Sequence, residues 1–133
     1  MKVKNVASLL AVGLVTGLSA SAQAGVIIFN ASSSDPRDRD TYVWVMNDDG
    51  TNKVQLASTR LAFEPNVSPD GTKIVFSKYI EPIQENKGRG LFIVNVDGSD
   101  LRQVTNAGNE DGQPMWSPDG TKIAFTRCER KLS

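Results

Sequence analysis

The sequence predicts an all-β fold: a partial β-propeller of about two four-stranded antiparallel blades, preceded by a signal peptide. The first observation is that Ser-Pro-Asp-Gly-Thr-Lys-Ile occurs twice, at 68–74 and 117–123, with a spacing of 49. The second is that a pair of similar segments, 42–57 and 91–105, precedes these copies at a spacing of 48. A repeat of this length that is built of short strands is typical of propeller blades.

The first 24 residues are expected to be a secretory signal peptide. Lys2 and Lys4 precede an apolar run over 6–18, and small residues with the pattern Ala-x-Ala follow it. This order of a basic region, a short apolar core and a cleavage site is typical of export signals. The run is shorter than the about 20 apolar residues that span a bilayer. We expect cleavage after Ala24, with Ala22 as the second choice, and no membrane span in the mature protein.

The mature chain is expected to contain nine strands in three units. The leading unit has three strands, the middle unit four and the last unit two. The leading unit begins with a strand at 25–30 and continues with a long strand near 42–47 and a short one that ends at Leu56. The expected strands of the other two units lie near 64–67, 73–78, 91–96, 101–105, 113–117 and 122–127.

Both faces of the long strands are apolar. In the segment at 42–47, Tyr42 and Trp44 point to one side, whereas Val43 and Val45 point to the other. A sheet with one wet face would alternate apolar with polar residues. The sheets are therefore expected to be covered on both sides, as blades are when they stack around an axis.

The repeated Ser-Pro-Asp-Gly segments predict tight turns. Proline presets the φ of the first central position, aspartate suits the second, and glycine accepts the left-handed conformation that follows. Asp70 and Asp119 are therefore interpreted as turn residues in separate blades, far apart. A hydrolase that uses two carboxylates would need them close together and differently tuned.

These units resemble TolB-type β-propeller repeats. The resemblance is carried by 116–125, by 91–105 and by their earlier copies. It covers the chain from 25 to 127, which we take as one incomplete propeller domain between the signal peptide (1–24) and a C-terminal tail (128–133). It implies a propeller that binds other proteins of the cell envelope, such as peptidoglycan-associated lipoprotein.

Nine strands make little more than two blades, whereas propellers close with about four to eight. An open stack leaves apolar faces and strand edges uncovered. Three explanations are open: a truncated relative of a longer propeller, which we favour, assembly with further copies of the chain, or a small domain that a partner stabilises.

Composition argues against several functions. Basic and acidic residues number 15 each, and removal of Lys2 and Lys4 leaves a slight acidic excess. Nucleic acid is therefore not expected as a partner. The sequence has no histidine and no Gly-x-Ser-x-Gly segment, so the usual general base and hydrolase nucleophile are missing. Cys128 is the only cysteine, which excludes an internal disulfide. We expect no enzymatic activity, no cofactor and no bound metal.

Two loops are candidate sites. Asp35, Asp38 and Asp40 could bind calcium, but their loop lacks the glycine and glutamate of an EF-hand, and a solvated hairpin loop is preferred. The loop at 79–90 is the longest insertion in the repeat, and long loops on a rigid scaffold often carry binding residues. Its candidate partner-binding residues are Tyr79, Glu81, Glu85, Lys87 and Arg89.

The sequence thus predicts an exported, non-enzymatic protein-interaction module, periplasmic or, as a second choice, secreted. Its partner would be a cell-envelope protein or another copy of the chain. The alternative is a remnant of the propeller domain that prolyl-oligopeptidase-like serine peptidases carry, without their catalytic domain. The repeats are similar to those of such peptidases as well.

Overall fold

The structure is a computed structural model that describes residues 25–35, 37–38, 40–80, 88–106 and 108–129. Within these ranges it contains nine strands and one 3₁₀ turn, which confirms the all-β prediction. The elements are β1 (Val26–Ser32), β2 (Thr41–Asn47), β3 (Val54–Gln55), η1 (Ala57–Thr59), β4 (Ala62–Val67), β5 (Lys73–Tyr79), β6 (Arg89–Asn95), β7 (Arg102–Gln103), β8 (Asn109–Trp116) and β9 (Ile123–Glu129). No helix in the described part of the chain is long and apolar enough to cross a membrane.

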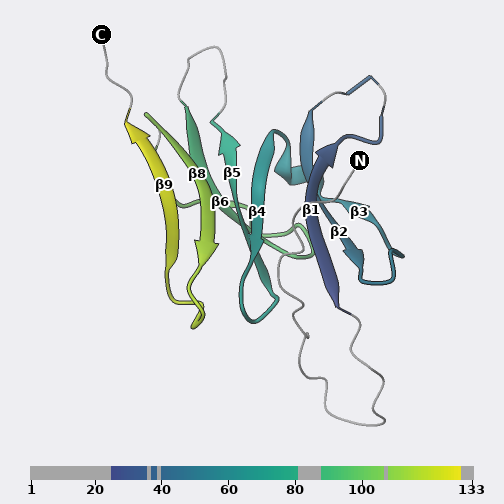
Figure 1. Ribbon diagram of the computed structural model, residues 1–133. Helices are drawn as coiled ribbons and strands as arrows, with labels where there is room; N and C mark the ends of the chain where they lie inside the picture. The colour runs from purple at the N-terminus through teal and green to yellow at the C-terminus, as the bar shows by residue number, and fades with distance from the viewer. Residues whose placement is uncertain (1–24, 36, 39, 81–87, 107, 130–133) are drawn as a thin grey trace.

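The strands form three groups that stand side by side, with β1–β3 at one end and β9 at the other (Figure 1). The first blade has the order β1-β2-β3, the middle blade β4-β5-β6-β7, and the last group is the hairpin β8-β9. Every pairing within a group is antiparallel. The nine expected strands are thus present among the described residues, but hydrogen bonding divides them into a three-stranded sheet and a six-stranded sheet.

One link between the groups was not expected. Arg89 of β6 and Glu110 of β8 form a single parallel pair, so the two repeated hairpins belong formally to one hydrogen-bonded sheet. Apart from that pair, β8 packs against β4, β5 and β6 together, as a strand does when it lies across the face of another sheet. The prediction of wholly separate sheets is thus wrong at this pair of residues, because neighbouring blades converge there.

Strands β4 and β8 begin earlier than predicted, and each contains a bulge. The register of β4 on β5 shifts between Phe63 and Asn66, and that of β8 on β9 shifts between Gly112 and Met115. The bulges repeat: Glu64 and Gln113, 49 positions apart, both have positive φ, 54° and 51°. A proline follows each of them, and a bulge tolerates the missing N–H of proline.

The main core lies between the first and middle blades. Both faces of β2 are apolar, as expected: Val43 faces the middle blade, whereas Trp44 lies on the opposite face beside Phe29 of the same sheet, under the ammonium group of Lys53. Cover by a second sheet is seen on the Val43 face alone among the described residues. The buried residues of the core are Ile28, Val43, Leu56, Ala62, Ile74, Phe76 and Val94. Because each blade is apolar on both faces, any face without a neighbour exposes apolar surface to solvent.

Strand β9 continues to Glu129. It therefore includes Cys128, which is an exposed free thiol, and Glu129, although the sequence analysis placed both residues in the tail. The last strand is therefore as long as β5, its counterpart in the middle blade.

Candidate binding cleft between the repeated hairpins

The first repeated turn is held by its own polar side chains. Asp70 Oδ1 accepts hydrogen bonds from Ser68 Oγ (2.5 Å), from Thr72 N (3.0 Å) and from Thr72 Oγ1 (2.9 Å). Ser68 Oγ in turn accepts from the backbone N–H of Lys73 at 2.9 Å. These bonds, that of Ser68 first, hold the pKa of Asp70 below its usual value.

The second turn repeats this arrangement. Asp119 Oδ1 accepts from Ser117 Oγ (2.5 Å), Thr121 N (3.0 Å) and Thr121 Oγ1 (2.8 Å). The Ser117 hydroxyl, followed by the Thr121 N–H, lowers the pKa of Asp119 to about 2. Both aspartates are thus ionised acceptors that stabilise a turn, and neither is tuned as a general acid.

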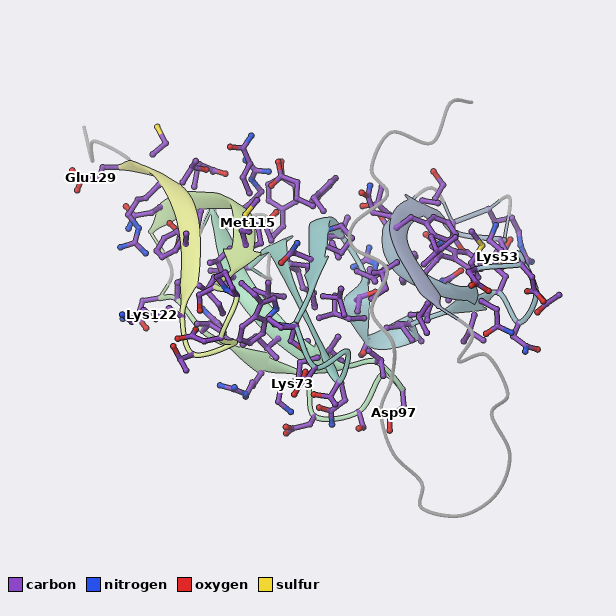
Figure 2. All side chains as sticks on the ribbon, turned by 60° about the horizontal axis from the view of Figure 1, so that its bottom comes forward. Lys53, Lys73, Asp97, Met115, Lys122 and Glu129 are labelled. Carbon is purple, nitrogen blue, oxygen red and sulfur yellow. The ribbon has the colours of Figure 1, made fainter. Side chains whose placement is uncertain are left out.

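The two turns lie next to each other, which corrects the prediction that Asp70 and Asp119 are far apart. A Cβ placed on Gly120 would lie 3.6 Å from Pro69 Cδ. Figure 2 looks at the molecule from the side of these turns and shows Lys73 and Lys122, which follow them, on that same side. The reason is geometric: neighbouring blades present equivalent turns at the same end of the stack, so repeat-equivalent residues become neighbours.

A cleft of about 520 Å³ lies between these hairpins. Its apolar lining comes from Ile93, Val104, Trp116 and Ile123. Its polar lining comes from Asp70, Asp119, Lys73, Lys122 and Arg102. An apolar floor with a few polar groups around it is the usual make-up of a binding site.

Trp116 is positioned by hydrogen bonds between β4 and β8. Its backbone N–H donates to Asn66 Oδ1 at 3.0 Å. Glu64 Oε2 accepts from the N–H of Gln113 at 2.8 Å and from Ser77 Oγ at 3.2 Å. The side chains of one bulge therefore satisfy the backbone donors of the next. The indole N–H of Trp116 is buried and has no hydrogen-bond partner in the described structure.

One ion pair joins the two strands of the last hairpin, and a second joins this hairpin to the middle blade. The buried carboxylate of Asp111 accepts from Arg127 Nε (2.7 Å) and Nη2 (2.8 Å), and this pairing lowers the pKa of Asp111. Arg89 Nε donates to Glu110 Oε2 at 3.0 Å, beside the parallel pair of β6 and β8. A bidentate pair of this kind fixes the orientation of β9 on β8.

The predicted partner-binding loop is described only at its two ends. Tyr79 is exposed and packs edge-on against Phe63, with ring centroids 5.8 Å apart. Arg89 is engaged by Glu110. The other candidates, Glu81, Glu85 and Lys87, lie outside the described residues. Binding by this loop stays a prediction.

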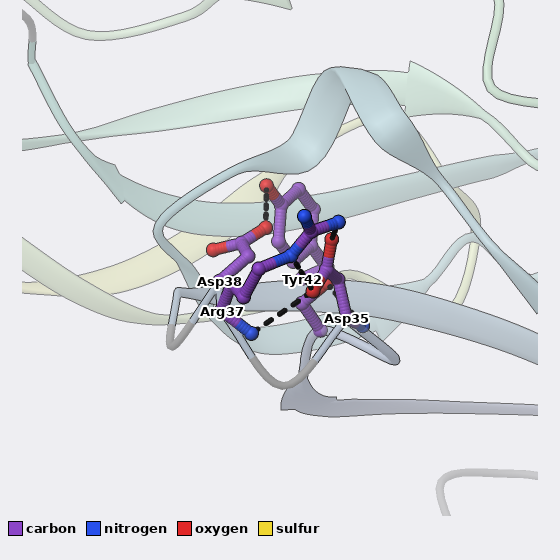
Figure 3. A network of polar contacts seen from close by, with 5 residues as sticks. Asp35, Arg37, Asp38 and Tyr42 are labelled. Carbon is purple, nitrogen blue, oxygen red and sulfur yellow. Dashed lines mark hydrogen bonds and ion pairs between the residues drawn. The ribbon is translucent and has the colours of Figure 1, made fainter.

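The charged loop between β1 and β2 is crosslinked by its own side chains (Figure 3). Asp35 accepts from Arg37 Nε (3.1 Å) and Nη2 (2.9 Å), and Asp38 accepts from Tyr42 Oη (2.8 Å). Asp40 pairs with Arg60 at 2.6 Å. Among the described residues, no group of three or more acidic, histidine or cysteine side chains is placed to hold a metal ion.

The sequence analysis did not predict the cleft, because a strand pattern along the chain does not show which apolar side chains a neighbouring strand covers. The number of strands in the last unit was the signal that could have revealed the cleft. The last unit has two strands in the described structure, so side chains that would face its third strand are exposed. Val104 is 42% exposed, whereas Leu56, its counterpart 48 positions earlier, is 4% exposed.

No family model matches the chain. Dipeptidyl-peptidase 5 of Porphyromonas gingivalis is 40% identical over 63 residues, which cover 47% of this chain and 9% of that protein. The Tol-Pal system protein TolB of Alcanivorax borkumensis is 35% identical over 72 residues, which cover 53% of this chain and 15% of that protein. The chain thus spans a small part of these relatives.

Among solved structures, a protein assigned as TolB from Agrobacterium tumefaciens superposes with a TM-score of 0.64 and 22% identity. The match covers 80% of this chain and 36% of that one. The chain therefore has the fold of TolB-like β-propeller repeats, as the repeated hairpins indicated.

Proposed function

We propose that this chain is an exported, non-catalytic module that binds a protein of the cell envelope. The observation that carries the proposal is the open cleft between the repeated hairpins. Its neighbourhood exposes Val104 and Phe125, so an apolar surface continues from the cleft on to β9. Exposed apolar patches on a rigid scaffold are typical of interaction sites.

The periplasm is the compartment that best fits this proposal. The N-terminal sequence has the order of an export signal. The likeness to the Tol-Pal system protein TolB supports the same compartment. A second copy of the chain is the other partner to be considered.

Lack of catalysis is supported by how the described carboxylates are used. Asp70 and Asp119 accept hydrogen bonds within their turns, and Asp111 is paired with Arg127. The sequence contains no histidine. These carboxylates are therefore committed to structure, and none is poised for proton transfer.

A second candidate is favoured by the 40% identity to dipeptidyl-peptidase 5. In this reading the chain is the propeller part of a serine peptidase. It would then shape access to a catalytic domain rather than bind an envelope protein. The DNA beyond codon 133 discriminates the two, because a hydrolase domain encoded there would support the peptidase.

The proposal is tested with a photo-crosslinking residue in place of Val104, in cells that produce the chain with its export signal. The control carries the same residue in place of Lys53, at the opposite end of the stack (Figure 2). We expect one envelope protein to crosslink at 104 and not at 53, and no turnover of chromogenic dipeptide substrates by the purified protein. Equal labelling at both positions, or peptide hydrolysis, would overturn the proposal.

A further inference from the structure

The first two blades each contain a stacked pair of aromatic rings, whereas the last group contains one ring of such a pair. Phe29 of β1 lies directly opposite Trp44 of β2, with ring centroids 6.4 Å apart and ring planes 11° apart. Phe76 of β5 lies opposite Phe92 of β6, at 6.2 Å and 20°. In both blades, one strand supplies the phenylalanine (β1 or β5) and the next strand along the chain (β2 or β6) supplies the ring that stacks on it.

Phe125 of β9 is the next phenylalanine in this series, 49 positions after Phe76. Strand β9 pairs with β8 along one edge, and no strand of the described structure pairs with its other edge. Phe125 is 39% exposed, whereas Phe76 is fully buried. The guanidinium of Arg127 lies over the ring of Phe125, 5.2 Å from its centroid. Among the described residues, none supplies the aromatic partner that the other blades provide at this position.

The middle blade shows which types of residue lie opposite the equivalent position. In the middle blade, Val94 lies opposite Ile74, and Phe92 opposite Phe76. A shift of 49 positions places a β-branched residue opposite Ile123 and an aromatic residue opposite Phe125. Directly opposed side chains of this kind are what stabilise neighbouring strands.

The cleft has a template in the chain as well. At the boundary of the first and middle blades, the turn after β6 covers Leu56: a Cβ on Gly98 would lie 3.5 Å from Leu56 Cδ2. Ser58 Oγ also donates to the carbonyl of Gly98 at 3.1 Å. Val104 is the counterpart of Leu56 and lines the open cleft. A strand that followed β9 and then turned would therefore fill the cleft.

We propose that the free edge of β9 and the cleft together bind one extended segment of a partner protein, antiparallel to β9. The segment presents an aromatic residue to Phe125 and a β-branched residue to Ile123, and its turn covers Val104. This inference rests on the proposed function and names its mode, which is addition of a strand to an exposed edge.

A folded second copy fits this site less well. Its best-matched strands, β2 and β6, already have neighbours on both edges. Its β1 pairs with β2 alone, but if Phe29 were set opposite Phe125, Ala31 would lie opposite Ile123 in antiparallel register. The small alanine would leave the cleft unfilled, so a separate partner is the better occupant.

The test uses the purified mature protein and a fluorescent peptide of residues 90–105, GLFIVNVDGSDLRQVT, which is the β6–β7 segment. We expect saturable binding by fluorescence anisotropy. Binding should weaken about 10-fold or more when Phe92 of the peptide becomes alanine, and again when the protein carries Phe125→Ala. The matched control is Met115→Ala, an exposed apolar residue of β8 that does not line this cleft, which should leave binding unchanged.

Hydrogen exchange locates the peptide. Slowed exchange in β9, with no change in β5, supports the edge site, whereas slowed exchange confined to β5 shows strand exchange in the middle blade and overturns the inference. Absence of saturable binding, or binding indifferent to Phe125→Ala, also overturns it, as does a dimer that Phe125→Ala dissolves. If an envelope protein crosslinks at 104 but the peptide does not bind, the proposed function stands and this inference fails. If the peptide binds but no envelope protein crosslinks, the edge site stands and the proposed function fails.

Discussion

The two repeat copies of one phenylalanine, Phe76 and Phe125, allow a matched test of how blades bury their core. Each is changed to alanine in a separate variant. Phe76 is fully buried and stacks on Phe92, whereas Phe125 is 39% exposed and lacks such a partner. If burial by the third strand is what stabilises this position, the same substitution should cost much more at 76 than at 125.

The expected magnitudes follow from area and cavity arguments. Full burial of a phenylalanine side chain stabilises the fold by about 1.5–3 kcal/mol, and the cavity that its removal leaves adds to the loss. Measured Phe→Ala changes in cores cost about 3–5 kcal/mol, and we expect about 4 kcal/mol for Phe76→Ala. At Phe125 part of the ring is already wet and no closed cavity is left, so we expect about 1–2 kcal/mol.

The assay is urea unfolding followed by the fluorescence of Trp44 and Trp116, with circular dichroism as a second probe. A difference of about 2–3 kcal/mol between the variants corresponds to melting temperatures at least about 10 °C apart in a domain of this size. Equal losses, or a larger loss at Phe125, would refute the assignment of the uncovered edge to β9. If Phe76→Ala does not fold, Phe76→Leu and Phe125→Leu should show the same order with smaller values.

Three further predictions follow from the polar contacts. Glu64→Ala leaves the N–H of Gln113 without its acceptor and should lower the free energy of unfolding by about 0.5–1.5 kcal/mol in urea titrations, whereas an unchanged midpoint would mean that water replaces the carboxylate. Arg127→Ala strands the buried carboxylate of Asp111 and should cost about 3 kcal/mol, of which Asp111→Ala in the same chain should recover part; no recovery would contradict the pairing. The pKa of Asp119 is lowered to about 2, so its contribution to stability is complete above the unfolded value of 3.8 and is lost as the pH falls through about 2; Asp119→Asn should reduce the fall in urea midpoint between pH 5 and pH 2, and an identical fall in both proteins would argue against the turn network.

Much of the fold could be predicted because its signals are local. The Ser-Pro-Asp-Gly turns use side chains and a glycine within six residues, as the bonds from Asp70 to Ser68 and Thr72 show. The bulges could not be predicted, because the positive φ of Glu64 and Gln113 depends on contacts between two blades. A strand pattern read along the chain holds no information on such contacts.

The candidate site divides in the same way. The loop residues Tyr79 and Arg89 were chosen for their place in a long insertion, yet the structure engages both, with Phe63 and Glu110. The cleft residues, among them Trp116 and Ile123, carry no local signal that separates them from buried strand residues. Whether an apolar residue is covered depends on the neighbouring strand, which for β9 is missing from the described structure.

By itself, the amino-acid sequence determined the strands, the turns and the two apolar faces of each blade, since these follow from side-chain period and turn chemistry over a few residues. Only the tertiary structure decided that the two repeated turns lie together, that a cleft opens between them, and that Phe125 lacks the ring that covers Phe76. Those features depend on which residues distant in the chain become neighbours when blades stack, and equal repeats become unequal wherever the stack has an uncovered edge.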